Sequence, residues 1–353
     1  MRPVFINGLG CLESGARLVL RELVRHYPAN GPRAILVLPS CNRADVANLP
    51  SQINVIALPH AIFGRWLRPL YELMVWLLAK CGRFSRIVNL SHYGLCPGGR
   101  YALYFHNQLL IEEGGNVLVG HRGKPDRFKR WLFQGCLRRA ERIIVQTEQA
   151  KKTMIRYAAA RGITPAPIEV VAPLPVMPAI EPDDGHRRLF AYQFFYPASD
   201  FSHKRAELAA RGIIEANKRD ARIGLVMTTG ENTGPAASCV ARIGRVSHAE
   251  ACAQLAASDA LLFTSSYETL GLPLLEAMTF GRPAVLPDLD YARAIYGDAA
   301  AFFEQATPES VADAILRCVK HHDDWHERVR GRREEVERGR VPWAGHWRRF
   351  GVV

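Results

Sequence analysis

The chain has 353 residues, and its 46 Lys and Arg residues against 34 Asp and Glu residues give a formal net charge of +12. With 48% hydrophobic and 23% charged residues, the composition is that of a folded protein and excludes an intrinsically disordered one. The length predicts roughly two domains, each with its own core. Residues 1–180 hold 24 basic and 10 acidic side chains, whereas residues 181–353 hold 22 and 24. We therefore expect an anionic partner or surface to meet the first half.

The eight cysteines are scattered singly, at positions 11, 41, 81, 96, 136, 239, 252 and 318. They show no C-x-x-C spacing and no His pair at zinc-ligand distance, so we expect reduced thiols, no disulfide framework and no metal. The start of the chain, Met1–Gly8, has no apolar run long enough for a signal peptide. No segment reaches the ~18–20 apolar residues of a membrane-spanning helix. These features predict a cytoplasmic protein.

Short β-branched or apolar runs alternate with helical patterns along the first half. Strands are predicted at Val4–Ile6, Ala34–Leu38, Asn54–Leu58, Ile87–Leu90, Ala102–Phe105 and Ile143–Gln146. Helices are predicted at Ala16–His26, Arg65–Cys81, Asp126–Arg139 and Glu148–Ala160. This alternation is typical of βαβ units, in which a parallel sheet is covered by helices on both faces.

The helical segment His60–Phe84 differs from the others in its composition. It combines Trp and Leu residues with flanking basic residues, among them Arg65, Trp66 and Arg68. Such a helix can lie on an anionic bilayer, with its apolar face in the headgroup region. A core helix with solvated ends is the simpler interpretation, and the two alternatives stay open.

The segment Pro165–Pro182 contains six prolines and is the best linker candidate. After it the alternation resumes, with strands predicted at Leu189–Phe194, Ile223–Thr228, Ala241–Ile243, Ala260–Phe263 and Ala284–Leu286. The sequence therefore predicts an α/β protein of two Rossmann-like doubly wound domains, residues 1–175 and 176–340, facing each other across a cleft. In such sheets ligands bind beyond the carboxyl ends of the strands.

The segment Asp259–Pro283 carries the most informative motif. An apolar strand runs into a polar loop with Glu268, then Gly271 permits a tight turn and Pro273 suits the first turn of a helix. The unpaired N–H groups at such a helix start can hold a diphosphate. Glu276, one turn inside, can accept hydrogen bonds from a ribose diol, and Glu268 can accept them from sugar hydroxyls. The plain alternative is a capped helix with two ordinary surface acids.

The ordered string Glu268-Thr-Leu-Gly-Leu-Pro-Leu-Leu-Glu276-Ala-Met resembles the donor-binding signature of retaining glycosyltransferases of family 4 (glycosyl transferases group 1), which have the GT-B fold. Thr264, Thr269 and Leu270 depart from the family's Pro, Gly and Phe, while both acids are kept. The resemblance implies a nucleotide-diphosphate sugar as donor, linked to UDP, GDP or dTDP. It implies donor-binding roles for ten residues: Gly8, Gly10, Thr229, Gly230, Ser265, Thr269, Leu270, Gly271, Leu272 and Glu276.

The similarity is dense over residues 140–300. The loop Tyr196–Arg205 resembles the one in which the family grips the donor phosphates with a basic pair, and Lys204 matches its lysine. The family's arginine falls on Ser199, so Arg205 is the candidate for the second cation. The resemblance thus implies phosphate contacts from Lys204, Arg205, Gly271 and Leu272.

The first domain offers shorter matches. Gly8-Leu-Gly10-Cys-Leu-Glu-Ser-Gly15 resembles the family's glycine-rich loop, although a plain strand–helix turn is the alternative. His106 stands where the family places a His facing the transferred sugar, with a structural His as the alternative, and Asn107 beside it is assigned to the acceptor side. The resemblance also implies that residues 341–353 form a helix that packs back on this domain.

Together these residues predict a retaining, metal-independent hexosyltransferase-like enzyme without a cofactor, with Glu268, Lys204 and His106 as catalytic residues. The basic first half and the Trp/Arg helix favour a glycan or lipid-linked acceptor of envelope or surface polysaccharide synthesis. An anionic membrane surface, contacted by Arg65, Trp66 and Arg68, is a further expected partner, so the enzyme would be peripheral on the inner face of the membrane.

Three other functions are alternatives to this prediction. A catalytically silent GT-B protein that only binds nucleotide is the main alternative, because Thr269, Leu270 and Ser199 depart from the family. Nucleic acid is not an expected partner, because the chain has no RNP-like aromatic motif or helix-turn-helix signature. A nucleotide-sugar 2-epimerase on the same fold would need further acids and a His that the sequence does not offer.

Overall fold

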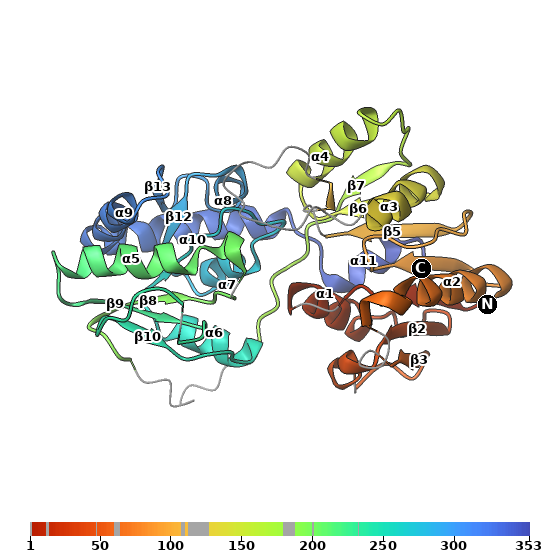
Figure 1. The fold of residues 1–353 in the computed structure, drawn as a ribbon, viewed down its shortest axis with the longest axis horizontal. Coiled ribbons are helices and arrows are strands. Elements are labelled where there is room, and N and C mark those ends of the chain that lie inside the picture. Colours follow the sequence, from red (N-terminus) through yellow and green to blue (C-terminus); the bar gives the residue numbers. More distant parts are fainter. Residues whose placement is uncertain are drawn as a thin grey trace. The chain divides into compact units, whose positions relative to one another are not determined.

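The computed structural model describes residues 2–11, 14–46, 48–59, 64–106, 110–111, 127–178, 188–199, 201–231 and 233–353, without the side chains of residues 14, 45 and 64–69. The described chain divides into two compact units (Figure 1). The first contains the described residues up to Leu174 and again Arg340–Val353. The second contains the described residues of Pro175–Gly339.

The first unit is built on a parallel sheet with the strand order β3-β2-β1-β4-β5-β6-β7 in the described chain. Its strands are β1 (Val4–Asn7), β2 (Ala34–Pro39), β3 (Ile53–Leu58), β4 (Arg86–Asn89), β5 (Tyr101–Phe105), β6 (Arg142–Val145) and β7 (Ile168–Val170). Its helices are α1 (Ser14–Arg25), α2 (Gly64–Cys81), α3 (Arg127–Arg139), α4 (Glu148–Ala159) and α11 (Trp343–Arg349), with 3-10 turns η1 (Ser40–Asn42) and η2 (Ala44–Val46). The central strands are buried because helices cover both faces of the sheet.

The second unit repeats this plan with the strand order β10-β9-β8-β11-β12-β13. Its strands are β8 (Tyr192–Tyr196), β9 (Ile223–Met227), β10 (Val240–Arg242), β11 (Ala260–Leu262), β12 (Ala284–Pro287) and β13 (Ala301–Phe303). Its helices are α5 (Ala206–Asn217), α6 (His248–Ala256), α7 (Leu272–Thr279), α8 (Asp290–Tyr296), α9 (Pro308–Lys320) and α10 (His322–Arg338), with the 3-10 turn η4 (Ser202–Lys204).

The strand orders determine where each unit can bind a ligand. In the first sheet the chain moves outward from β1 to β3 and then returns to β4 on the other side of β1, so the order reverses there. The second sheet reverses in the same way between β8 and β11. Right-handed crossovers then place helices on opposite faces on either side of this point, which opens a crevice at the carboxyl ends of the two strands. Both sheets thus present a candidate ligand edge.

The last helix belongs to the first unit. Trp347 of α11 is fully buried, and its indole Nε1 donates a hydrogen bond to the Leu23 carbonyl of α1 at 2.9 Å. Its ring meets the Tyr27 ring edge-on, with 4.8 Å between centroids. Helix α11, near the end of the chain, therefore packs in the core of the first unit against α1, near its beginning.

Two predicted boundaries differ from the structure. The Pro-rich segment contains strand β7, and the unit boundary falls after Leu174, so the expected linker began too early. Pro165 and Pro167 precede β7, which is an edge strand and tolerates the loss of N–H donors. The first strand of the second unit begins at Tyr192 instead of Leu189.

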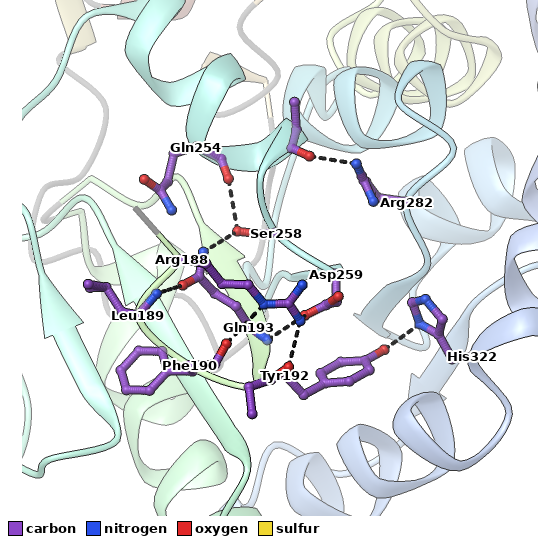
Figure 2. A network of polar contacts seen from close by, with 12 residues as sticks. Arg188, Leu189, Phe190, Tyr192, Gln193, Gln254, Ser258, Asp259, Arg282 and His322 are labelled. Carbon is purple, nitrogen blue, oxygen red and sulfur yellow. Dashed lines mark hydrogen bonds and ion pairs between the residues drawn. The ribbon is translucent and has the colours of Figure 1, made fainter. Parts of the chain in front are cut away.

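A polar network explains this later start (Figure 2). The Asp259 carboxylate accepts a hydrogen bond from the Gln193 backbone N–H at 2.7 Å and pairs with Arg188, while the Gln193 side chain donates to Ser258 Oγ. Leu189 N–H donates to the Gln193 side-chain oxygen at 2.9 Å, so the residues before the strand are bonded to a side chain of the strand. The network lies at the amino ends of β8 and β11, opposite the edge that carries the candidate site.

Candidate active site

Two loops of the second unit are joined at the carboxyl ends of β8 and β11. Thr264, which follows β11, donates through Oγ1 to the carbonyls of Lys204 and Arg205 at 3.1 and 2.9 Å. Ser266 N–H donates to the His203 carbonyl at 2.8 Å. Thr264 occupies the position at which the family has Pro, and its hydroxyl donates hydrogen bonds that a Pro side chain could not. The loop with the predicted basic residues is thereby fixed against the loop with the predicted acid.

Lys204 and Glu268 form the centre of this region. The Lys204 Nζ lies 2.5 Å from Glu268 Oε1, and the two side chains are only 15% and 13% exposed. Tyr196 OH donates to the Lys204 carbonyl, which fixes the backbone of the lysine. Burial raises the pKa of Tyr291 well above its usual value, and the Glu268 carboxylate adds to this shift. The structure thus brings together two residues that the sequence placed 64 positions apart.

Helix α7 begins directly after this pair. Gly271 precedes it with φ +66° and ψ +54°, a left-handed conformation that favours glycine, and no side chain caps the helix. Pro273 occupies the first turn, where its missing N–H costs nothing. Leu272 is the first helical residue, so the backbone at Gly271–Leu272 presents the positive end of the helix dipole. This is the position at which the sequence predicted a diphosphate contact.

Glu276 lies one turn inside α7 and is 7% exposed. Its Oε1 is 2.8 Å from Nε2 of His248, the first residue of α6. Cys252, one turn further along α6, has its Sγ 3.5 Å from the same His248 nitrogen. Burial raises the pKa of the Cys252 thiol, with the Glu276 carboxylate as the second cause. The sequence prediction included Glu276 but missed His248 and Cys252, although their four-residue spacing on one helix is a readable signal.

The remaining predicted donor residues of this unit surround the same strand ends. Thr229 follows β9, and its buried Oγ1 has no hydrogen-bond partner in the described part of the chain. Gly230 beside it has open space where a Cβ would be. Ser265 Oγ donates to the Tyr267 carbonyl at 3.0 Å, and Thr269 is half-buried and Leu270 buried just before Gly271. The Thr229 hydroxyl is therefore a buried polar group whose hydrogen-bonding capacity the described residues leave unused.

Arg205 is placed differently from Lys204. It has φ +49° at the start of α5 and lines an open hollow of about 550 Å³ together with Ser199 and Phe201. The residues that line this hollow include neither Lys204 nor Glu268. Arg205 therefore borders this hollow, while its backbone carbonyl shares Thr264 Oγ1 with that of Lys204.

The first unit carries its own polar edge at the ends of β1 and β4. Gly10 N–H donates to Ser91 Oγ at 2.7 Å, and Ser91 Oγ in turn donates to Asn7 Oδ1 at 3.1 Å. A Cβ on Gly10 would lie 2.7 Å from the Ser91 Cα, and one on Gly8 would lie 3.1 Å from Leu20 Cδ1. Packing alone thus requires glycine at position 10.

His106 follows β5 and its ring meets the His92 ring edge-on, with ring centroids 3.7 Å apart. Burial lowers the pKa of His106 well below its usual value, and the neighbouring His92 lowers it further. His92 itself has φ +62°, which is rare for a residue other than glycine and often marks a functional position. His106 is therefore neutral at physiological pH. Asn107 lies outside the described residues.

Helix α2 exposes a row of leucines. Leu70, Leu73 and Leu77, spaced along one face, are 58%, 43% and 45% exposed. The side chains of Arg65, Trp66 and Arg68 lie outside the described residues. In the described part of the chain, no helix combines the length and apolarity that crossing a bilayer demands.

The chain was compared with protein-family models, curated sequences and solved structures. Residues 209–321 match the family model described as glycosyl transferases group 1, which covers the segment with Glu268, Gly271 and Glu276. No curated protein sequence matches the chain.

Solved structures resemble the chain over nearly its whole length. Sucrose-phosphate synthase from Thermosynechococcus elongatus is 13% identical with a TM-score of 0.73, covering 99% of this chain and 96% of that one. Anabaena HepE in complex with UDP and glucose is 14% identical with a TM-score of 0.69, covering 99% and 98%. WaaG, a glycosyltransferase involved in lipopolysaccharide biosynthesis, is 16% identical with a TM-score of 0.66, covering 94% and 95%. The predicted GT-B fold is therefore confirmed.

Proposed function

We propose that this protein is a retaining glycosyltransferase that moves a sugar from a nucleotide-diphosphate donor to an acceptor hydroxyl. The observation that carries the proposal is the partly buried Lys204–Glu268 pair before the uncapped start of α7, with Glu276 one turn inside that helix. A cation, a helix N-terminus and two carboxylates match the phosphates, the sugar and the ribose of one donor. They also lie at the strand ends where this type of sheet binds ligands.

The donor that we propose first is a UDP-linked sugar. Structures of HepE, a protein of the same fold, contain UDP and UDP-glucose. In this chain Glu276 would accept hydrogen bonds from the ribose hydroxyls, and Glu268 would accept them from the sugar. Lys204 and the backbone at Gly271–Leu272 would hold the diphosphate. GDP- and dTDP-sugars are the competing donors.

The chemistry that these residues can assist is departure of the diphosphate. The bond between the anomeric carbon and the phosphate oxygen breaks, and its electron pair goes to the diphosphate. The acceptor oxygen bonds to the anomeric carbon from the same face, and its proton passes to a phosphate oxygen of the donor. Lys204 and the α7 start would stabilise the growing negative charge, which is the largest single catalytic effect available to such a site. We propose that no metal ion is needed for this step, because the protein supplies the cationic charge.

Residues of the first unit are proposed for the sugar and the acceptor. A neutral His106 can donate a hydrogen bond without adding a positive charge near the oxocarbenium-like centre. Asn107 is proposed for the acceptor, and Gly8 and Gly10 for close approach of the backbone to the donor. The acceptor that we propose is a glycan or lipid-linked intermediate of envelope or surface polysaccharide synthesis.

We also propose that the enzyme works as a cytoplasmic protein on the inner face of an anionic membrane. Residues 1–180 hold the whole positive surplus of the chain. The exposed leucines of α2 and the 60% exposed Trp131 of α3 add apolar surface to this unit. Basic and apolar side chains together are what a peripheral membrane protein needs.

The proposal is tested by measuring release of the matching nucleoside diphosphate (UDP, GDP or dTDP) from candidate UDP-, GDP- and dTDP-sugars in the presence of glycan or lipid-linked acceptors. Lys204→Ala is expected to lower kcat by about 100- to 1000-fold, the usual effect of removing a group that stabilises the leaving charge. Glu276→Gln is expected to raise the KM for the donor. Lys218→Ala is the matched control, because this lysine at the C-cap of α5 is 63% exposed and pairs only with Glu215 in the described chain. Full activity in the first two variants would overturn the site assignment.

A catalytically silent nucleotide-binding protein is the second candidate. The observation that favours it is Ser199 in place of the family's arginine. Calorimetry distinguishes the two candidates, because a silent protein binds UDP yet releases none from any donor. Binding that is lost in Lys204→Ala would still place the nucleotide at this site.

A further inference from the structure

The cluster of His248, Cys252 and Glu276 has a composition that a sugar-binding site does not require. It supplies one imidazole nitrogen, one thiol sulfur and one carboxylate oxygen, and all three atoms lie within 4.8 Å of one another. We propose that these residues form a site for a thiophilic divalent cation of the Zn²⁺ class, and that its occupancy excludes the nucleotide. The cation site stands on its own geometry, whereas the exclusion rests on the proposed function.

One of the two separations matches a tetrahedral ion, and the other is shorter than such an ion requires. Zinc binds sulfur at about 2.3 Å and nitrogen at about 2.0 Å, so a tetrahedral site separates these two atoms by about 3.5 Å. The Cys252 Sγ and His248 Nε2 are 3.5 Å apart. For nitrogen and oxygen the expected separation is about 3.3 Å, and the His248 Nε2 and Glu276 Oε1 are 2.8 Å apart. Entry of the ion therefore needs only a small outward shift of the Glu276 carboxylate.

The two ligands on α6 are held by the backbone. His248 and Cys252 are four residues apart, which places them on adjacent turns of the same helix face. The helix start is fixed by a capping box, in which Ser247 and Glu250 exchange side-chain and backbone hydrogen bonds. Glu276 comes from α7, whose neighbouring residues are buried in the core of the second unit. The three ligands are thus preorganised before an ion arrives.

Charge and access favour the same conclusion. Glu276 is 7% exposed and has no Lys or Arg partner among the residues that the structure describes. A buried carboxylate without a permanent cation is costly, and an ion at this point would compensate it. His248 is 24% exposed, so the cluster is open to solvent on the histidine side. Three protein ligands leave a fourth position for water, as in zinc sites with an open coordination position.

Zinc binding is measured on the full-length protein by competition with a chromophoric chelator, in the absence of nucleotide. Cys252→Ala is expected to weaken the affinity by at least about 100-fold, the upper range for losing an outer-shell partner alone. Cys318→Ala, which removes another buried thiol of the same unit, is the matched control and should bind as the parent does. No saturable binding by the parent, or equal binding by the parent and Cys252→Ala, would overturn the proposal.

Cobalt substitution gives a second readout that leaves the three proposed ligands unchanged. Co²⁺ bound by Cys252 must show a thiolate-to-metal charge-transfer band, and its absence at saturation contradicts the site even if a variant misfolds. The exposed thiols of Cys41 and Cys81 are replaced by Ser in this experiment, so that they cannot contribute the band.

Exclusion is tested with UDP in a metal-buffered solution, because the buffer holds free Zn²⁺ constant although UDP itself chelates the ion. Saturating UDP is expected to weaken zinc binding, and zinc must weaken UDP binding by the same factor. If UDP, GDP and dTDP all fail to bind in the absence of metal, the proposed function fails while the cation site stands. If both bind without affecting each other, the exclusion is wrong.

Discussion

At the scale of single residues, two explanations account for glycine at position 10: ligand binding and packing. A loop that closes on a donor needs glycine so that the ligand can approach the backbone. The structure shows a nearer reason, because the Ser91 backbone already occupies the space of a Gly10 Cβ, at 2.7 Å from both its Cα and its carbonyl oxygen. Packing against the β4 end is therefore sufficient to require glycine, whatever the loop binds.

We expect Gly10→Ala to destabilise the protein by about 1–3 kcal/mol, the range for forcing extra volume into a packed site. Gly15→Ala is the matched control in the same motif, because its Cβ would meet nothing within 4 Å and it lies in α1. That variant should lose no stability and gain up to about 1 kcal/mol. Urea unfolding measures both. Equal stability of Gly10→Ala and the parent would show that the Ser91 segment yields easily.

The position of a residue on a loop or a helix could be predicted where the pattern was contiguous in the sequence. Glu268, Gly271 and Glu276 form one contiguous pattern, so their joint position on a loop and helix start was readable. His248 was not, because its proximity to Glu276 depends on how α6 packs against α7. The Lys204–Glu268 contact likewise depends on Thr264 tying two loops together, which spacing alone does not encode.

At the scale of elements, alternation of apolar runs and helical patterns was enough to locate most strands. Every predicted strand overlaps an observed one, since a buried parallel strand is a short continuous apolar run. Strand β7 was missed because its flanking prolines resemble a linker, and an edge strand tolerates them. The start of β8 was misplaced because Asp259, far along the chain, holds the segment before it.

Helix α2 leads to a prediction about membranes. We expect the protein to float with vesicles that contain anionic lipid at low salt, and to be released by high salt, because its charges are screened there. Replacing Leu70, Leu73 and Leu77 with Gln should abolish flotation, since these exposed side chains would enter the headgroup region. Leu189→Gln, an exposed leucine of the second unit, should float as the parent does. No flotation of the parent would remove the membrane from the proposed function.

At the scale of the whole molecule, the two ends of the chain build one unit. Residues 340–353 return to the first unit, where Trp347 packs against α1 and Val341 bridges to Pro173. The helix that closes this unit is short and carries a fully buried histidine, His346. Its ring stacks on Trp343, with 5.3 Å between centroids, and meets Tyr104 edge-on. Stability of the first unit therefore depends on a titratable group at the far end of the sequence.

Burial lowers the pKa of His346 from its ordinary 6.5 to about 4. Between these values the unfolded chain binds a proton that the folded protein excludes, so stability falls with falling pH. We expect the free energy of unfolding to drop by about 3 kcal/mol between pH 6.5 and pH 4 from this group. Urea unfolding followed by tryptophan fluorescence reports mainly on the first unit, to which five of the six tryptophans belong.

The comparison that isolates His346 is with His346→Gln, which cannot titrate. Burial also lowers the pKa of His106, so the His346→Gln variant retains part of the acid sensitivity of the parent. The contribution of His346 is the difference between the two curves of unfolding free energy against pH. His26→Gln, at an exposed position of the same unit, should follow the parent. Parallel curves for the parent and His346→Gln would contradict the lowered pKa of His346 in the folded protein.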